Sequence, residues 1–515
     1  MKRFLKAIIK IIFSRTLIIA LMILIQAAVF PLALTYLRNY FPAVVEAMSL
    51  MGGIMIIIII NNDEPAEFKL TWAIFVCLFP VLGTLIYVFV KSNWGMAGLR
   101  RKVRASRQKT EGLTYTSKGT HSALERESAS FRRFAYYMEK TCGYPVYHNT
   151  VTTYYPTGEE TIEALKEDLK KAKKFIFMEF FIIDDGIVWD SILKILKEKV
   201  KEGVEVYVMY DGLCSIMLLP YYYPKKLASY GIHSKMFAPL VPFLSTTQNN
   251  RDHRKIVVID GEVAFTGGVN LADEYANIKE RFGYWKDAGI RLEGRAAMSF
   301  SLMFMQNWNI YGKKEIDYEK YLKEDENRQR HEHDGFVIPY GDTPTLLKEV
   351  AKTVYEDIFA HAVDYIHIMT PYFIVDREFL SVMRYAALRG VDVKMILPHI
   401  PDKRYAFFIA RTFYRTLCEA GIKVYEYKPG FVHAKIMVSD DRMATCGSVN
   451  LDYRSFYHHF ENGVCLYENS SVKKIEEDFE NTLKDCIEVN EEYYKNIPVY
   501  QRILGRILRL VAPMM

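Results

Sequence analysis

The chain has 515 residues, of which 50% are hydrophobic and 25% are charged, and its formal net charge is +6. This length exceeds that of one ordinary domain, and the mixture of apolar and charged residues suits a protein that is partly embedded in a membrane and partly soluble. The seven scattered cysteines include no Cys-x2-Cys pair, which argues against a structural zinc site and fits a reducing compartment.

Positive charge is concentrated near the N-terminus. Residues 1–110 carry 14 basic and 4 acidic side chains, a net charge of +10, which leaves −4 for the rest of the chain. A basic segment joined to an acidic body favours an anionic lipid surface over nucleic acid as the partner. The same charge can instead be a topology signal, and the sequence leaves both interpretations open.

Apolar runs in the N-terminal region predict membrane helices. Leu17–Leu37 and Leu70–Val90 each have about the 20 residues needed to cross a bilayer. Ala43–Ile60 is shorter and contains a glutamate and two glycines, so it is a third candidate. We therefore expect residues 1–104 to form a membrane anchor with two or three transmembrane helices and a basic collar.

Basic residues lie on both sides of these runs, in Met1–Arg15 and in Lys91–Lys109. Positively charged loops tend to stay in the cytoplasm, and placing both segments there requires an even number of crossings. With three crossings, Met1–Arg15 would instead lie along the interface as an amphipathic helix. The collar is the larger cluster, so we expect the body of the protein to be cytoplasmic.

The rest of the chain predicts an α/β fold made of two similar halves. After a polar linker at residues 105–132, apolar strands alternate with amphipathic helices. The repeated unit is a strand, a helix and a second strand: Lys174–Ile183, Asp190–Glu202 and Val204–Tyr210 in the first half, and Tyr365–Ile374, Phe379–Arg389 and Val391–Leu397 in the second. Such uniformly apolar strands predict mixed, mainly parallel sheets covered on both faces. We place the halves at residues 133–330 and 331–515.

The C-terminal segment Gln501–Val511 predicts an amphipathic helix. Three arginines, Arg502, Arg506 and Arg509, lie on one helical face, and apolar side chains cover the rest. This pattern is typical of a helix that lies at a membrane interface.

Each half contains the same pattern of polar residues. The first copy is His253-x-Lys255-x4-Asp260 followed by Gly267-Gly-Val-Asn270, and the second, with the same offsets, is His433-x-Lys435-x4-Asp440 followed by Gly447-Ser448-Val-Asn450. One such match is a weak signal, because a single histidine before a strand is usually structural. Two complete copies at equivalent positions of a duplicated fold indicate a functional site.

These residue types suit attack on a phosphodiester. Lysine and asparagine can hold the anionic oxygens, while a neutral imidazole attacks phosphorus and a protonated one releases the alcohol. That division requires environments that separate the two histidine pKa values. Asp260 and Asp440 either anchor the motif or fix the tautomer of a histidine. The set acts without a metal, so we expect neither a metal nor another cofactor.

With these motifs the chain resembles the phospholipase D superfamily and, more narrowly, bacterial cardiolipin synthases. The similarity runs over nearly the whole chain, and the supporting stretches are Trp72–Tyr87, Asn250–Lys255, Thr266–Tyr275, Tyr284–Asp287, Thr370–Phe373 and Gly447–Glu461. The resemblance implies two pseudo-symmetric phospholipase D-like halves that meet at one site. It also implies that His253 is the nucleophile and that His433 is the acid and later the base.

The same resemblance assigns the remaining site residues. Four side chains would hold the phosphate oxygens: Lys255, Lys435, Asn270 and Asn450. Ser448 and Glu461 would complete the substrate site. Two features depart from the superfamily pattern. Gly268 stands where many members carry serine or threonine, and His458 and His459 stand where a less basic pair is expected. We place these two histidines at the surface.

The function implied is that of a cardiolipin synthase in a bacterial cell membrane. It would transfer a phosphatidyl group from one phosphatidylglycerol to another, with release of glycerol, through a phosphohistidine. The expected partners are the membrane and its anionic lipids, phosphatidylglycerol and cardiolipin, and not nucleic acid, while the oligomeric state stays open. A phospholipase D-type hydrolase and a synthase that uses phosphatidylethanolamine as donor are the alternatives. A non-enzymatic lipid-binding scaffold would predict decay of one motif, and both motifs are intact.

Overall fold

The computed structural model describes residues 35–36, 42–91, 94–214, 218–220, 222–239, 249–311, 315–322, 334–344 and 349–514. The chain divides into two compact units, Met1–Ser92 and Asn93–Met515. Met1–Arg15 and nearly all of the predicted span Leu17–Leu37 lie outside the described residues.

Three helices pack together in the N-terminal unit: α3 (Pro42–Ile60), α4 (Ala66–Leu78) and α5 (Pro80–Lys91). The apolar run Leu70–Val90 is therefore two helices rather than one, because Pro80 lacks the N–H that would continue α4. The rings of Trp72 and Tyr87 meet at 5.2 Å between centroids, so α5 folds back along α4. In the part of the chain that the structure describes, no helix has both the length and the apolar content that a bilayer crossing needs.

The second unit contains two large sheets. The first consists of seven strands: β1 (Thr150–Tyr155), β2 (Phe175–Phe180), β3 (Glu205–Asp211), β4 (His233–Phe237), β5 (Lys255–Ile259), β6 (Val263–Gly267) and β8 (Gly289–Gly294). The second consists of eight: β9 (Phe336–Asp342), β10 (Tyr365–Met369), β12 (Asp392–Pro398), β13 (Lys423–Tyr427), β15 (Ile436–Ser439), β16 (Met443–Gly447), β18 (Glu461–Tyr467) and β19 (Cys486–Glu488).

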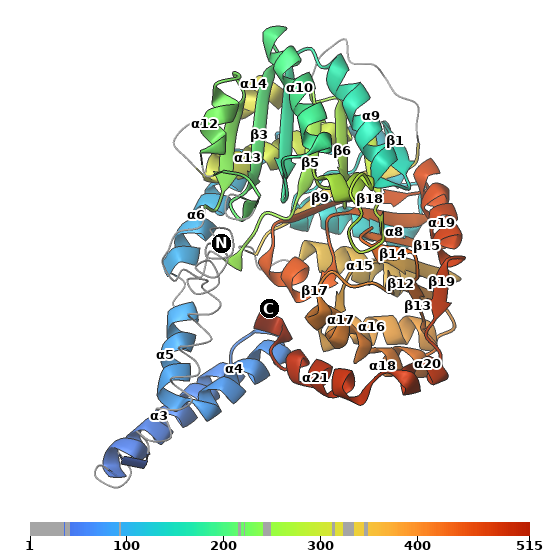
Figure 1. Cartoon of the computed structure of the whole chain (residues 1–515). Coiled ribbons are helices and arrows are strands. Elements are labelled where there is room, and N and C mark those ends of the chain that lie inside the picture. The colour runs from blue at the N-terminus through green and yellow to red at the C-terminus, as the bar shows by residue number, and fades with distance from the viewer. Residues whose placement is uncertain are drawn as a thin grey trace, which may run out of the picture. The chain divides into compact units, whose positions relative to one another are not determined.

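The two sheets repeat one strand order. The first runs β1-β8-β6-β5-β2-β3-β4, and the second runs β9-β18-β16-β15-β10-β12-β13-β19. Each strand of the first sheet thus has a counterpart at the same place in the second, and β19 is an addition at the edge. In Figure 1 the green first half lies above the orange and red second half. The prediction of a duplicated α/β fold is confirmed.

The sheets are mixed but mainly antiparallel, which corrects the prediction of mainly parallel sheets. Among the described strands of the two sheets, the parallel pairs are β2-β3, β3-β4, β10-β12 and β12-β13. Each motif strand returns through a hairpin, at Asp260-Gly261 in the first half, where φ is +55° and +73°, and at Asp440-Asp441 in the second, where φ is +54° and +53°. Antiparallel strands that are covered on both faces are as apolar as parallel ones, so their composition does not reveal strand direction. The Asp260-Gly261 pair was the only local pattern that indicated a hairpin.

Helices cover both faces of each sheet. The helices of the first half are α9 (Gly158–Lys171), α10 (Ile187–Lys201), α12 (Tyr223–Ala228), α13 (Ala296–Ile310) and α14 (Tyr318–Leu322). Met178 of β2 belongs to the core formed with α9 and α10, whereas its neighbour Phe177 stacks on Phe304 of α13 at 4.6 Å. Successive side chains of a strand point to opposite faces, so α13 covers the face opposite α9 and α10.

The second half has a matching set of helices: α15 (Val350–His361), α16 (Arg377–Leu388), α17 (Arg404–Arg411), α18 (Tyr414–Glu419), α19 (Ser470–Leu483), α20 (Glu491–Asn496) and α21 (Val499–Arg509). α13 of the first half contacts β9 of the second, and α19 of the second half contacts β1 of the first. The same kind of contact is therefore made in both directions between the halves, as expected for two pseudo-symmetric units.

The polar linker and the expected collar, apart from Lys91 and Ser92, belong to the second unit. They form α6 (Trp94–Lys109), α7 (Lys118–Leu124) and α8 (Ala129–Tyr136). Arg107 of α6 donates a hydrogen bond to the Tyr144 hydroxyl at 2.8 Å, and the hydroxyls of Ser106 and Tyr318 lie 2.9 Å apart. The division between the two units falls at Ser92, and residues 105–132 belong to the unit that contains the two sheets.

The C-terminal amphipathic helix is present as α21. A Cβ on Gly505 would lie 2.3 Å from the carbonyl oxygen of Phe408, so glycine permits the close approach of α21 to α17. On the remaining surface of α21, Ile503 and Ile507 are 54% and 57% exposed. The helix thus presents an apolar face that the described residues leave uncovered.

Candidate active site

The two motif histidines lie immediately before equivalent strands, His253 before β5 and His433 before β15. Each is fixed by a backbone hydrogen bond to the opposite half. The N–H of His253 donates to the carbonyl of Phe460 at 2.9 Å, and the N–H of His433 donates to the carbonyl of Lys286 at 2.7 Å. The halves therefore hold each other's motif.

Both histidines line one cavity of about 600 Å³. Asn270 and Asn450 line the same cavity. The structure thus brings together two predicted residues from each half around a single space.

Each histidine is paired with a carboxylate from the opposite half. Nδ1 of His253 lies 3.0 Å from both carboxylate oxygens of Glu461, and Nδ1 of His433 lies 2.7 Å from Oδ2 of Asp287. A carboxylate beside Nδ1 favours the tautomer with its proton there, which leaves the lone pair on Nε2. Nε2 is then the nitrogen of each ring that can act on a substrate.

Asp287 is a site residue that the sequence reasoning missed. It follows β7 (Tyr284–Lys286), which pairs in parallel with β14 (Gly430–Val432), the strand that leads to His433. In the other half, a bridge between Asp252 and Phe460 plays the corresponding part for His253. Asp287 lies in one of the stretches that carried the resemblance, but no local pattern shows which histidine it meets.

Asp287 also explains the departure at Gly268. A Cβ at this position would lie 2.0 Å from Oδ1 of Asp287 and 2.9 Å from the carbonyl oxygen of His433. The equivalent Ser448 instead donates a hydrogen bond to the Glu461 carboxylate. The two halves therefore hold their acidic residues differently. A hydroxyl fits at Ser448 in the second half but not at Gly268 in the first.

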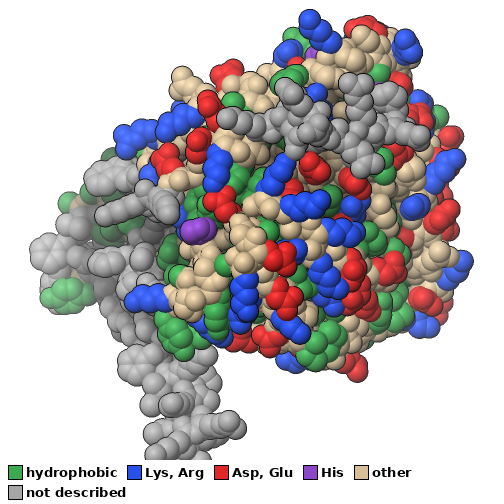
Figure 2. Space-filling view, turned by 90° about the horizontal axis from the view of Figure 1, so that it is seen from above, with side chains coloured by type: hydrophobic (Ala, Val, Ile, Leu, Met, Phe, Trp, Pro, Cys, Tyr) green, Lys and Arg blue, Asp and Glu red, His purple; other side chains and the backbone are tan. Residues whose placement is uncertain are grey.

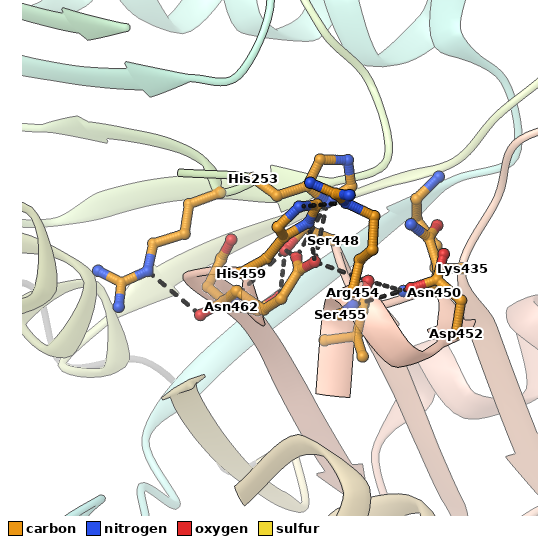
Figure 3. A network of polar contacts seen from close by, with 12 residues as sticks. His253, Lys435, Ser448, Asn450, Asp452, Arg454, Ser455, His459 and Asn462 are labelled. Atoms are coloured by element: carbon orange, nitrogen blue, oxygen red, sulfur yellow. Dashed lines mark hydrogen bonds and ion pairs between the residues drawn. The ribbon is translucent and has the colours of Figure 1, made fainter. Parts of the chain in front are cut away.

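Ser448 and Glu461, predicted to complete the substrate site, lie behind His253. Besides Ser448, the hydroxyl of Ser455 donates to Oε1 of Glu461 at 2.8 Å. Figure 3 shows this network, in which the serines surround the carboxylate that holds the ring of His253. Neither Ser448 nor Glu461 is among the residues that line the cavity. Their contacts orient His253.

Asp260 and Asp440, predicted as catalytic, lie at the far ends of the motif strands from the histidines. Asp260 accepts hydrogen bonds from the backbone N–H groups of Lys173, Lys174 and Phe175 at 2.7 to 2.9 Å. Asp440 accepts three equivalent bonds from residues 363–365 at 2.8 to 2.9 Å. Of the two alternatives left by the sequence, these contacts support anchoring. Because Nδ1 of each motif histidine is paired with another carboxylate, neither aspartate sets a histidine tautomer.

The two motif lysines are buried beside the histidines. Nζ of Lys255 donates to the carbonyl of His253 at 2.6 Å, and Nζ of Lys435 donates to the carbonyl of His433. Burial lowers the pKa of Lys255 to about 7 and that of Lys435 to about 8. A charge that costs this much to bury is one that a bound anion would stabilise.

Burial lowers the pKa of both His253 and His433 well below the ordinary value, and the two lysines lower them further. Both rings are therefore neutral at pH 7 in the unliganded site. The expected division of roles requires environments that separate the two histidine pKa values, and the unliganded site does not show this difference. The reason is that both rings experience the same burial and the same pair of lysines, so the division of roles has to arise with substrate.

His459 is not at the surface, which corrects the prediction made for it. Its side chain is buried, it lines the cavity, and its ring lies 5.5 Å from that of His253. Nε of Arg454 donates to its Nε2 at 3.1 Å. His458 is half-buried instead, with Nε2 3.2 Å from the carbonyl oxygen of Pro513. The burial of His459 could have been predicted from its position two residues before Glu461, because residues two apart in an extended chain lie on the same face.

Two groups of side chains among the described residues have metal-ligand chemistry: His253, His459 and Glu461, and His367, Glu476 and Glu480. In the first group the oxygens of Glu461 already accept hydrogen bonds from Ser448 and Ser455 and pair with His253. Hydrogen bonding therefore accounts for this arrangement, and the expectation that no metal is needed stays a prediction.

Comparison with known proteins gives the family. Residues 165–280 and 355–483 match the family described as "Cardiolipin synthase, PLD-like domain", and each segment contains one complete motif. A cardiolipin synthase of Alkalihalophilus pseudofirmus is 34% identical over 470 residues, which cover 89% of this chain and 91% of that protein. The chain belongs to the cardiolipin synthase family.

Two further proteins match over a similar share of this chain. Cardiolipin synthase 2 of Bacillus cereus is 33% identical over 461 residues, 89% of each chain. An uncharacterized protein of Streptococcus mutans is 43% identical over 460 residues, 89% of this chain and 99% of that one. Residues 53–91 match the family described as "Phospholipase D-nuclease N-terminal".

The fold of this cardiolipin synthase family member also has a solved relative. The crystal structure of phosphatidylserine synthase from Haemophilus influenzae aligns with a TM-score of 0.52 and 17% identity, over 70% of this chain and 93% of that one. At this identity the likeness concerns the fold alone. It agrees with the duplicated phospholipase D-like architecture seen in the two sheets.

Proposed function

We propose that this protein is a cardiolipin synthase that transfers a phosphatidyl group from one phosphatidylglycerol to the headgroup hydroxyl of another. The observation that carries the proposal is the cavity shared by His253 and His433, each held by a carboxylate of the opposite half. Membership of the cardiolipin synthase family supports the choice of substrate.

The first step forms a covalent intermediate. Nε2 of His253 attacks the phosphorus of the donor, so a P–N bond forms and the P–O bond to glycerol breaks. The carboxylate of Glu461 stabilises the positive charge that develops on this ring. His433 gives its proton to the departing alkoxide and is held in place by Asp287. The products of this step are free glycerol and phosphatidyl-His253.

In the second step His433 acts as a base instead of an acid, and His253 is the leaving group. The hydroxyl of a second phosphatidylglycerol gives its proton to His433 and attacks the phosphohistidine, so a P–O bond forms and the P–N bond breaks. Cardiolipin leaves, and both histidines return to their starting state. The two rings have equivalent surroundings, so the geometry does not distinguish nucleophile from acid. The resemblance to the superfamily assigns the nucleophile to His253.

Four side chains fit the role of holding the phosphate oxygens: Lys255, Lys435, Asn270 and Asn450. The lowered pKa values of the lysines fit a site that is completed by an anion. Such an anion raises the pKa of a nearby histidine, which supplies the protonated acid that the unliganded site lacks.

Lipid rather than nucleic acid fits the surroundings of the site. The cavity is lined by apolar side chains such as Phe181, Phe282 and Trp285 as well as by the polar motif residues. Over the face of the molecule in Figure 2, Lys and Arg side chains are interspersed with Asp and Glu instead of forming a continuous basic track. Ala512, just beyond the exposed apolar face of α21, reaches the cavity wall. We propose that the enzyme acts at a bacterial cell membrane. The basic collar favours the cytoplasmic side for this body, and the N-terminal unit is the proposed anchor.

The test is to incubate the purified full chain with phosphatidylglycerol alone and to identify the lipid products by mass spectrometry. We expect cardiolipin and glycerol in equal amounts from the wild type, and neither from His253→Ala or His433→Ala. Phosphatidic acid and glycerol without cardiolipin would establish hydrolysis instead. Ethanolamine release in a parallel mixture with phosphatidylethanolamine would identify that lipid as a donor.

A further inference from the structure

Arg251, Arg454 and His459 form a cluster that the transfer chemistry at the two motif histidines does not use. All three line the cavity. His459 lies beside His253, with 5.5 Å between ring centroids, and Arg454 donates from Nε to Nε2 of His459 at 3.1 Å. Figure 3 shows Arg454 lying against His459, next to His253. The cluster therefore borders the nucleophile.

The cluster combines two guanidinium groups in a largely buried place. Burial lowers the pKa of Arg454, the nearby carboxyl of Asp452 opposes this shift, and the neighbouring charge of Arg251 adds to it. Arg251 is itself buried, and its Nη1 lies 3.5 Å from Oδ1 of Asp211, a carboxyl whose pKa burial raises to about 7. The acid beside Arg251 is thus only partly ionised at neutral pH.

Arg454 is set apart from the other cationic side chains of the cavity by its partners. Arg281 lies 2.8 Å from Glu274, and Lys403 lies 2.7 Å from Asp402, so each has a carboxylate. Among the described residues, Arg454 donates hydrogen bonds to neutral groups, His459 and Oδ1 of Asn249. Asp452 is the nearest acidic neighbour of Arg454, but no direct ion pair joins them among the described residues. A largely buried guanidinium that makes no direct ion pair is costly unless an anion completes the site.

His459 adds a second observation that points to a ligand. Its Nε2 accepts from Arg454, so the neutral ring carries its proton on Nδ1. This Nδ1 is buried and makes no hydrogen bond with the described residues, and it lies 3.7 Å from Oε1 of Glu461. The contact with His459 fixes the plane of the Arg454 guanidinium. Its Nη1 group makes no hydrogen bond with the described residues, so it is the group that would meet a ligand.

We propose that Arg251, Arg454 and His459 form a second anion subsite that holds the phosphate of the acceptor lipid. The inference rests on the proposed function, because making cardiolipin requires two phosphates, joined through one glycerol, to occupy the same cavity. The donor phosphate belongs between His253 and His433, so the acceptor phosphate needs cationic groups of its own nearby. Holding it there keeps the attacking hydroxyl next to the phosphohistidine and favours transfer over reaction with water.

Two reactions of the full chain distinguish this subsite from the transfer chemistry. Exchange of isotope-labelled free glycerol into phosphatidylglycerol uses the phosphohistidine but needs no second phosphate. Cardiolipin formation needs both. In vesicles of phosphatidylglycerol, we expect Arg454→Gln to lower the rate of cardiolipin formation about tenfold more than the rate of glycerol exchange. Hydrolysis to phosphatidic acid should take a larger share of the product.

Arg454→Lys, which keeps the charge but loses the forked donors, should fall between wild type and Arg454→Gln in the ratio of the two rates. Arg442→Gln is the control for removing an arginine, because Arg442 is 52% exposed and paired with Glu468 at 2.6 Å on the surface. Because each result is a ratio of two rates of the same sample, partial unfolding of a variant cancels.

An unchanged ratio of cardiolipin formation to glycerol exchange in Arg454→Gln and Arg251→Gln would overturn the subsite. Failure of the proposed function has a different signature: the wild type would exchange glycerol or hydrolyse phosphatidylglycerol but make no cardiolipin.

Discussion

Nδ1 of His433 lies 2.7 Å from Oδ2 of Asp287, and the two residues come from opposite halves of the duplicated body. The pairing of β7 with β14 brings them together. The equivalent contact joins His253 to Glu461 in the other direction. Neither half can assemble a complete histidine and carboxylate pair by itself, so the site exists only where the halves meet.

Replacing Asp287 by Asn should remove the carboxylate that stabilises a protonated His433. We expect the kcat for cardiolipin formation to fall by about 100-fold or more, because an acid and a base are needed in turn at this ring. Asp190→Asn, at an exposed position of α10, is the control for loss of a carboxylate. A kcat for Asp287→Asn within a few-fold of wild type would exclude the assigned role of the pair.

Gly268→Ser should restore the hydroxyl that many superfamily members carry, yet impair this enzyme. The new Cβ would lie 2.0 Å from Oδ1 of Asp287, so the carboxylate has to move away from His433. We expect a loss of kcat similar to that of Asp287→Asn, together with a lower melting temperature. Ser448→Gly is the converse change and should disturb Glu461 and His253 instead. If Gly268→Ser is as active as wild type, the space assigned to Asp287 is wrong.

The affinity for anionic substrate should fall as pH rises through 7 and 8. Burial lowers the pKa of Lys255 to about 7 and of Lys435 to about 8, and each lysine attracts phosphate only while protonated. We expect kcat/KM for phosphatidylglycerol to decline above pH 7. In Lys255→Arg this decline should begin at a higher pH, because arginine stays protonated. The unliganded protein should gain stability as pH rises from about 7 towards 10.5, the unfolded pKa of lysine. Over this interval the unfolded chain binds protons that the folded lysines have lost, so the cost of burying the two lysines shrinks progressively.

The aspartates of the motif should matter for stability more than for chemistry. Asp260→Ala and Asp440→Ala each remove the acceptor of three backbone N–H groups. We expect each change to lower the free energy of unfolding by about 2 kcal/mol. The kcat of the folded fraction should stay within a few-fold of wild type. A large loss of kcat at unchanged melting temperature would return these residues to the catalytic set.

The exposed face of α21 should help the enzyme act on lipid in a bilayer. Ile503 and Ile507 are 54% and 57% exposed, and burying each in an interface contributes about 2 kcal/mol. The double change to Glu should lower the rate on vesicles relative to the rate on detergent-solubilised phosphatidylglycerol. Val363→Glu, at a position 73% exposed, is the control. Equal losses on both forms of substrate would show that α21 has no role at the membrane.

The sequence was sufficient for the duplicated fold and for the motif residues because both are written in local patterns that occur twice. Strand direction was not, since antiparallel strands buried on both faces have the same apolar composition as parallel ones. The partners Asp287 and His459 were not predicted because their contacts depend on pairing between distant segments, as in β7 with β14. Pro80 could have been read as the break in Leu70–Val90, since proline removes a helix donor.

In the proposed mechanism His253 and His433 act on one phosphorus atom. The most direct measurement is a crystal structure of the full chain with vanadate, which adopts the five-coordinate geometry of phosphoryl transfer. We expect a single vanadate in the shared cavity, bonded to Nε2 of His253 and hydrogen-bonded to Nε2 of His433. Vanadate bound at only one histidine, with the other ring out of reach of its oxygens, would contradict the mechanism.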